Sequence, residues 1–248
     1  FMLAFEAQNT DLEMQPMAEL RVFLKTIFLL LIVLVTLSET ISTGDDADVQ
    51  VGVITPTHYN IDLILDPRSS TYEGVVEIMF NTTNNVMNII QLHASSETIN
   101  VTSAISNFED ACNITGYTKE YEFLTIICPL GPDENKDDSL VVRFQGKYTT
   151  DNKKGLYKGT YTEGGQEYVL LASQSTNSAA RGAFPCFDQP EMKATFDVYI
   201  THPGDYRVLG NTVVKKQYAV GSNQIQTQLE TTPEMSTYLL SFIVSKLA

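Results

Sequence analysis

Apolar and polar side chains alternate along most of the chain after about residue 50. In residues 58–65, "HYNIDLIL", every second side chain is apolar while Asn60 and Asp62 face the other way. This period of two indicates a strand with one buried face. Residues 72–80, "YEGVVEIMF", repeat the pattern. Further strands are predicted at residues 88–94, 121–130, 139–148, 166–173, 193–202, 206–210, 224–230 and 236–247.

Glycine, asparagine, aspartate and proline separate these segments, and no long amphipathic helical pattern occurs among them. The pattern predicts an all-β fold, a curved, mostly antiparallel and sandwich-like structure. No repeat or low-complexity linker divides it, so we expect one domain over residues 44–248. The last predicted strand runs almost to Ala248 without a polar tail. We therefore expect an unpaired strand edge there and a C-terminally truncated domain.

Residues 1–43 have a different character and are predicted to be a leader. From Met17, the positive residues Arg21 and Lys25 precede twelve residues of mostly apolar character, residues 26–37, and then a small, polar segment. Twelve residues are fewer than the roughly 20 that cross a bilayer as a helix. A cleaved signal peptide is favoured, with Met17 as the true start, and a signal-anchor helix beginning near Val22 is the alternative. Either apolar leader helix predicts export.

The net charge of −14 argues against a nucleic-acid partner, because binding phosphates requires a basic face. It fits either a cationic substrate or the solubility of an exported protein. Three Asn-x-Thr sequons, at Asn81, Asn100 and Asn113, agree with export and predict a glycosylated surface.

The three cysteines fall into a pair and a single residue. Cys112 and Cys128 flank the segment "NITGYTKEYEFLTII" and can close a hairpin by a disulfide in an oxidising compartment. Cys186 lies between Pro185 and Phe187, with no histidine nearby in the sequence to activate it. A buried thiol is therefore favoured over a nucleophile.

One connection between predicted strands carries unusual chemistry: "SQSTNSAARGAFPCFDQPEMKATF", residues 173–196. Gln174 stands at a strand end, where its amide can accept a hydrogen bond from a ligand's ammonium group or can simply be solvated. Arg181 can anchor the loop by pairing with a carboxylate, and Asp188 is one candidate. The prolines stiffen the connection. Loop support is accordingly assigned to Arg181, Phe184, Pro185, Asp188 and Pro190.

At these residues the sequence resembles the aminopeptidase N family of zinc exopeptidases. The family pattern is close to T-Q-F/M-x-x-x-D-A-R-R/K-A/S-F-P-C-F-D-E-P-x-x-K-A-x-F. Further landmarks follow the family's order, and the resemblance covers about residues 51–246. They are "TPTHYNIDLILDP", "YEGVVEIMF", "KKGLYKGTY" and "TTPEMSTYLLSFIVS".

The resemblance implies the N-terminal β domain of a metalloaminopeptidase, with Gln174 binding the free α-amino group of a peptide substrate. It also implies zinc in the full-length protein, held by a thermolysin-like domain with H-E-x-x-H, a motif absent from this sequence. No metal ligand or catalytic group is therefore expected in this chain, which should be inactive alone. The family members with leaders imply an exported protein, secreted or held at the extracellular face of the plasma membrane by an anchor.

Three departures favour a second hypothesis. Ala179 replaces the family's aspartate, Gly182 its second basic residue and Gln189 its glutamate. These losses can loosen the support of the loop. The alternative is thus a non-catalytic exported binding module, a truncated or degenerate homologue.

Overall fold

The computed structural model describes residues 54–82, 89–106, 111–118, 122–128, 138–151, 153–176 and 178–246. The leader prediction, residues 1–43, lies outside the described residues. The described residues belong to one compact unit, Gln50–Ala248. They are mostly β-structure, as predicted, and the ordered segments that are not strands include two short 3₁₀ turns, η1 (Ala180–Gly182) and η2 (Thr237–Leu239).

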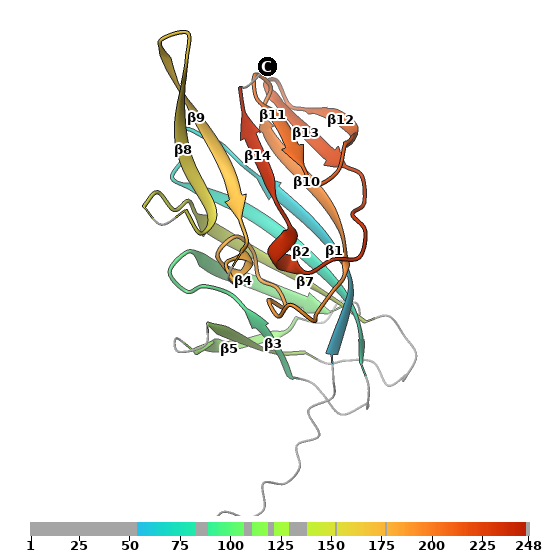
Figure 1. Ribbon diagram of the computed structural model, residues 1–248. Coiled ribbons are helices and arrows are strands. Elements are labelled where there is room, and N and C mark those ends of the chain that lie inside the picture. Colours follow the sequence, from blue (N-terminus) through green and yellow to red (C-terminus); the bar gives the residue numbers. More distant parts are fainter. Residues whose placement is uncertain are drawn as a thin grey trace, which may run out of the picture. The chain divides into compact units, whose positions relative to one another are not determined.

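Seven strands form the largest sheet, in the order β12-β13-β10-β1-β2-β7-β4 (Figure 1). All neighbours are antiparallel except β1 and β10, which run parallel. Their bounds are β1 (Ile54–Ile64), β2 (Thr71–Thr82), β4 (Ile99–Ser106), β7 (Asp138–Lys147), β10 (Thr195–Pro203), β12 (Val214–Val220) and β13 (Gln224–Leu229).

Two smaller antiparallel sheets complete the described fold. One has the order β11-β14-β9-β8 and the other β3-β6-β5. Their bounds are β3 (Ile89–His93), β5 (Asn113–Thr118), β6 (Phe123–Ile127), β8 (Gly155–Glu163), β9 (Gln166–Gln174), β11 (Arg207–Gly210) and β14 (Phe242–Ser245).

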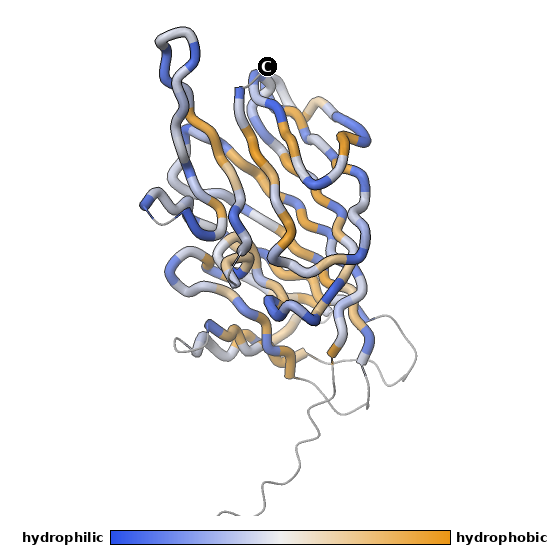
Figure 2. Tube along the Cα trace, in the orientation of Figure 1, coloured by the Kyte–Doolittle hydropathy of each residue, from blue (hydrophilic) through white to orange (hydrophobic). Residues whose placement is uncertain are grey.

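All three sheets contribute to one hydrophobic core. The alternating residues Tyr59, Ile61 and Leu63 of β1 are fully buried, and β2, β7 and β10 bury matching residues. Leu171 of β9 and Leu124 of β6 belong to the same cluster. Hydrophobic residues are accordingly concentrated in the strands (Figure 2). One face of the seven-stranded sheet is therefore internal, as the period-two pattern predicts.

The C-terminal segment differs from the prediction of a single strand over residues 236–247. Thr237–Leu239 forms η2, and only Phe242–Ser245 is a strand. The expected unpaired edge is also wrong, since β14 pairs with β11 on one side and β9 on the other. The C-terminal segment is hydrophobic because β14 lies between two other strands of its sheet.

Candidate functional site

Gln174 is the last residue of β9, opposite Gly155 of β8, and its side chain is exposed. Its amide nitrogen lies 3.4 Å from the hydroxyl oxygen of Thr176, at the long limit of a hydrogen bond. Thr176 also lines a pocket of about 360 Å³, together with Ser178, Asp188, Pro190, Thr237 and Tyr238. The amide oxygen can thus receive a donor from outside the domain.

The connection after Gln174 is pinned by a buried ion pair. Arg181, in η1, places its Nε 3.0 Å from Oδ2 of Asp188, whose side chain is 1% exposed. The Arg181 backbone N–H also donates to that oxygen, at 3.3 Å. A guanidinium nitrogen of Arg181 lies 3.6 Å from the Glu122 carboxylate. The loop is therefore closed on itself by Asp188 and connected to the segment before β6.

Two residues distant in sequence complete the contacts of Asp188. The Thr237 hydroxyl, in η2, donates to Oδ1 at 2.8 Å. The backbone N–H of Asp188 donates to Nδ1 of His93 at 3.2 Å. Accepting this bond fixes the proton of neutral His93 on the other ring nitrogen. Burial, followed by the Arg181 charge, lowers the pKa of His93 to about 4, so the ring is neutral at physiological pH. We name Arg181, Asp188, His93 and Thr237 the Asp188 network.

The apolar part of the connection packs into the core. Phe184, Pro185, Cys186 and Phe187 are all buried. The Phe187 N–H donates to the hydroxyl oxygen of Tyr59 at 3.2 Å. Cys186 exchanges both backbone hydrogen bonds with His93. Burial raises the pKa of the Cys186 thiol, which keeps it protonated and unreactive.

The remaining predicted support residue, Pro190, is exposed, and its carbonyl accepts a hydrogen bond from the Ser236 hydroxyl. Asp188 and Pro190 thus share a pocket with Thr176, which neighbours Gln174, whereas Arg181 lines a separate hollow with Glu122. Sequence reasoning missed His93, Tyr59, Ser236 and Thr237, because they lie far away in the chain and match no local motif.

The three departures from the family pattern all lie on this connection. Ala179 is buried, and Gly182 packs against the backbone of Gly155. The amide oxygen of Gln189 is buried, and no hydrogen-bond partner for it occurs in the described part of the chain. A buried acceptor without a partner is unfavourable. Gln189 is thus the departure that leaves a buried polar atom without a partner among the described residues.

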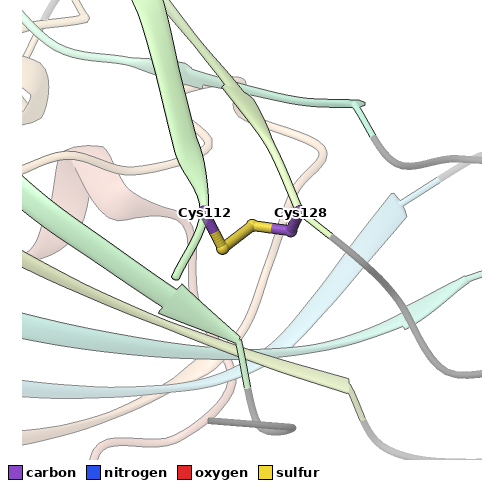
Figure 3. The surroundings of a disulfide bond; sticks show 2 residues. All are labelled: Cys112 and Cys128. Carbon is purple, nitrogen blue, oxygen red and sulfur yellow. A yellow bond between two sulfur atoms is a disulfide. The ribbon is translucent and has the colours of Figure 1, made fainter. Parts of the chain in front are cut away.

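Among the described residues, no group of three or more histidine, cysteine, aspartate or glutamate side chains is arranged to hold a metal ion. Within the same ranges, no helix is long and apolar enough to span a membrane. Cys112 and Cys128 are joined by a disulfide beside the β5–β6 hairpin (Figure 3). The sequon residues Asn81, Asn100 and Asn113 are all exposed.

These features define a class of protein. It is a β domain in which a polar side chain, Gln174, lies at the end of a strand, and the connection that follows is held by a buried ion pair. Residues 55–239 match the family model described as the peptidase M1 N-terminal domain. The chain therefore belongs to the family of peptidase M1 N-terminal domains.

Curated relatives are aminopeptidases. Over 128 residues the chain is 38% identical to "Aminopeptidase N" of Bos taurus, covering 50% of this chain and 13% of the relative. Over 198 residues it is 32% identical to "Alanine/arginine aminopeptidase" of Saccharomyces cerevisiae, covering 78% of this chain and 22% of the relative. "Glutamyl aminopeptidase" of Sus scrofa is 30% identical over 197 residues, 77% of this chain and 21% of the relative. The chain thus matches less than a quarter of the length of each relative.

Proposed function

We propose that this chain is the N-terminal, substrate-binding domain of an exported zinc aminopeptidase that removes N-terminal residues from peptides. The carrying observation is Gln174, an exposed amide at the end of β9, next to a pocket and a connection fixed by the Asp188 network. Membership of the family and relatives named as aminopeptidases support the reaction class. Curved sheets packed as a sandwich would serve as the scaffold.

In this proposal Gln174 selects peptides with a free N-terminus. Its amide oxygen accepts a hydrogen bond from the substrate's α-ammonium group, a charge-assisted contact. Because the amide is neutral, it can do so without the desolvation cost of a carboxylate. The rigid connection keeps the amide in place, so little conformational entropy is lost when substrate binds.

The described residues do not fit a zinc ion, because they hold no set of three ligands. We therefore assign the metal to a thermolysin-like domain of the full-length protein, where zinc would polarise the scissile carbonyl. We further propose export, with the protein secreted or anchored at the extracellular face of the plasma membrane.

The test is steady-state kinetics of Gln174→Ala in a full-length enzyme that carries the catalytic domain. Loss of a hydrogen bond to a charged group should raise KM and lower kcat/KM by a factor equivalent to about 1.5–3 kcal/mol. Gln166→Ala, at the exposed opposite end of β9, is the matched control and should leave both constants unchanged. Equal kinetics for the two variants would remove the assignment of Gln174.

A second function is favoured by Ala179, Gly182 and Gln189, and specifically by the unpartnered amide oxygen of Gln189. It is a non-catalytic exported module that binds a partner through its glycosylated β surface. Sequencing the transcript 3′ of the Ala248 codon separates the two. An open frame leading to H-E-x-x-H supports the enzyme, and a stop codon supports the module.

A further inference from the structure

The outer face of the seven-stranded sheet carries a groove of about 780 Å³, away from the Asp188 network. A second hollow of about 490 Å³ shares Asp62, Val75, Arg143 and Gln226 with it, so the two form one continuous surface. Volumes of this size are typical of ligand sites. We call this surface the sheet groove.

Hydrogen-bonding side chains and apolar side chains share the lining of the sheet groove. Acceptors come from the carboxylates of Asp62, Glu73 and Glu77, and a guanidinium donor from Arg143 between them. The amide nitrogen of Gln226 lies 3.3 Å from Asp62, and further amides and hydroxyls line the rim. Such a mixture of neutral and charged donors and acceptors matches a ligand whose groups both donate and accept, as sugar hydroxyls do. The carboxylates outnumber the Arg143 guanidinium, so the groove has a net negative charge that disfavours an anionic ligand and fits a neutral sugar.

One sequon lies on this face of the sheet. Asn100, exposed on edge strand β4, is directly opposite Gln145 of β7, and Gln145 is opposite Glu73 of β2. Residues opposite each other across paired strands present their side chains on the same face. Gln145 and Glu73 both line the groove, as does Thr102, the third residue of the sequon. Asn100 therefore stands at the rim of the sheet groove.

We propose that the sheet groove is a carbohydrate-binding surface and that its occupant is the N-linked glycan of Asn100 in this chain. Neighbouring strands are about 4.8 Å apart, so Glu73 lies about 10 Å from Asn100, within reach of the inner sugars. Gln145 and Glu73 hydrogen-bond these sugars first, and Arg143 lies beneath the next. The glycan then covers a polar sheet face. This inference rests on the proposed export, because glycans are added in the secretory pathway.

The test uses the full chain secreted from cultured animal cells. Mass spectrometry of its peptides gives the glycan occupancy at Asn81, Asn100 and Asn113. Phenylglyoxal, which modifies accessible guanidinium groups, is then applied to the folded protein before and after treatment with a peptide-N-glycosidase. Exposed Arg207 of β11 lies on a different sheet and is the internal reference.

The glycan should slow modification of Arg143 several-fold, and its removal should restore the rate, while Arg207 reacts equally throughout. Asn100→Gln should reproduce the faster reaction, whereas the matched variant Asn113→Gln, on β5 of another sheet, should not. Enzymatic removal keeps the test valid if Asn100→Gln fails to fold.

Equal Arg143 rates with and without an occupied Asn100 would overturn the proposal. So would an unoccupied Asn100 in a chain that carries glycans at Asn81 or Asn113, although export would then stand. A chain that is not exported would overturn the glycan proposal and the proposed export together. Full-length kinetics of Gln174→Ala do not depend on any of these results, so the enzymatic proposal is tested separately.

Discussion

The guanidinium Nε of Arg181 lies 3.0 Å from Oδ2 of Asp188, and the two side chains are 14% and 1% exposed. The same carboxylate accepts the Thr237 hydroxyl, and the Asp188 backbone binds His93. The Asp188 carboxylate thus holds η1 and η2 together, and its backbone joins the connection after Gln174 to β3. Removing one partner of such a pair costs more stability than the pair contributes as a whole, because the other charge stays buried without compensation.

Asp188→Ala should lower the free energy of unfolding by about 3–5 kcal/mol, because Arg181 stays buried without its main partner. Urea denaturation of the full chain measures this change. Asp66→Ala is the matched control, since its pair with Arg68 lies at 2.8 Å but is 33% and 74% exposed. That pair should contribute about 0–1 kcal/mol. Similar losses for both variants would contradict the structural role of Asp188.

His93 should make the domain less stable in mild acid. Its folded-state pKa of about 4 lies below the ordinary value of 6.5, so the unfolded chain binds this proton first. The stability that neutral His93 contributes is present above pH 6.5 and is lost as the pH falls toward 4, by about 3 kcal/mol at most.

The measurement is the free energy of unfolding against pH. His93→Gln, whose amide oxygen can still accept the Asp188 N–H, should flatten the slope between pH 6.5 and 4. An unchanged slope in that variant would show that other groups cause the acid dependence.

The strands best predicted from the sequence are those that bury one face. In β2 and β7, in most of β1 and in residues 195–200 of β10, a buried and a less buried residue alternate, so the sequence carries the period directly. By contrast, β12 was missed because it is an edge strand exposed at every position, with no buried face to set a pattern. Strands β4, β5 and β8 were also missed, since few of their positions are fully buried.

Tertiary contacts explain where local reasoning failed. Thr237 lies in a segment of strong β propensity, yet it forms a 3₁₀ turn that donates a hydrogen bond to buried Asp188. Tertiary context overrides propensity in such places. Likewise, the Arg181–Asp188 pair is seven residues apart and could be anticipated, whereas His93 is 95 residues from Asp188. No local pattern connects the latter two.

Gly155 should be intolerant of a side chain. Its φ is +68°, and a Cβ there would lie 2.6 Å from the carbonyl carbon of Gly182, in the connection. Gly155→Ala should therefore destabilise the domain by about 2–5 kcal/mol, from backbone strain plus a clash with rigid backbone. Gly164→Ala is the control, with φ +59° but open space around the Cβ, and should cost only about 1–2 kcal/mol. Equal losses in thermal or urea unfolding would mean that the contact with Gly182 is unimportant.

The disulfide between Cys112 and Cys128 should contribute about 3 kcal/mol, because it closes a loop with a sequence separation of 16 in the unfolded chain. The double variant Cys112→Ser/Cys128→Ser should lose this amount in urea unfolding under oxidising conditions. A reductant should lower the stability of the wild-type chain by a similar amount and leave the double variant unchanged, which controls for other effects of the reductant.

Thiol titration in denaturant should find one free cysteine, Cys186, before reduction and three after it. Three free thiols before reduction would contradict the disulfide, and the hairpin would then be held by its backbone ladder alone.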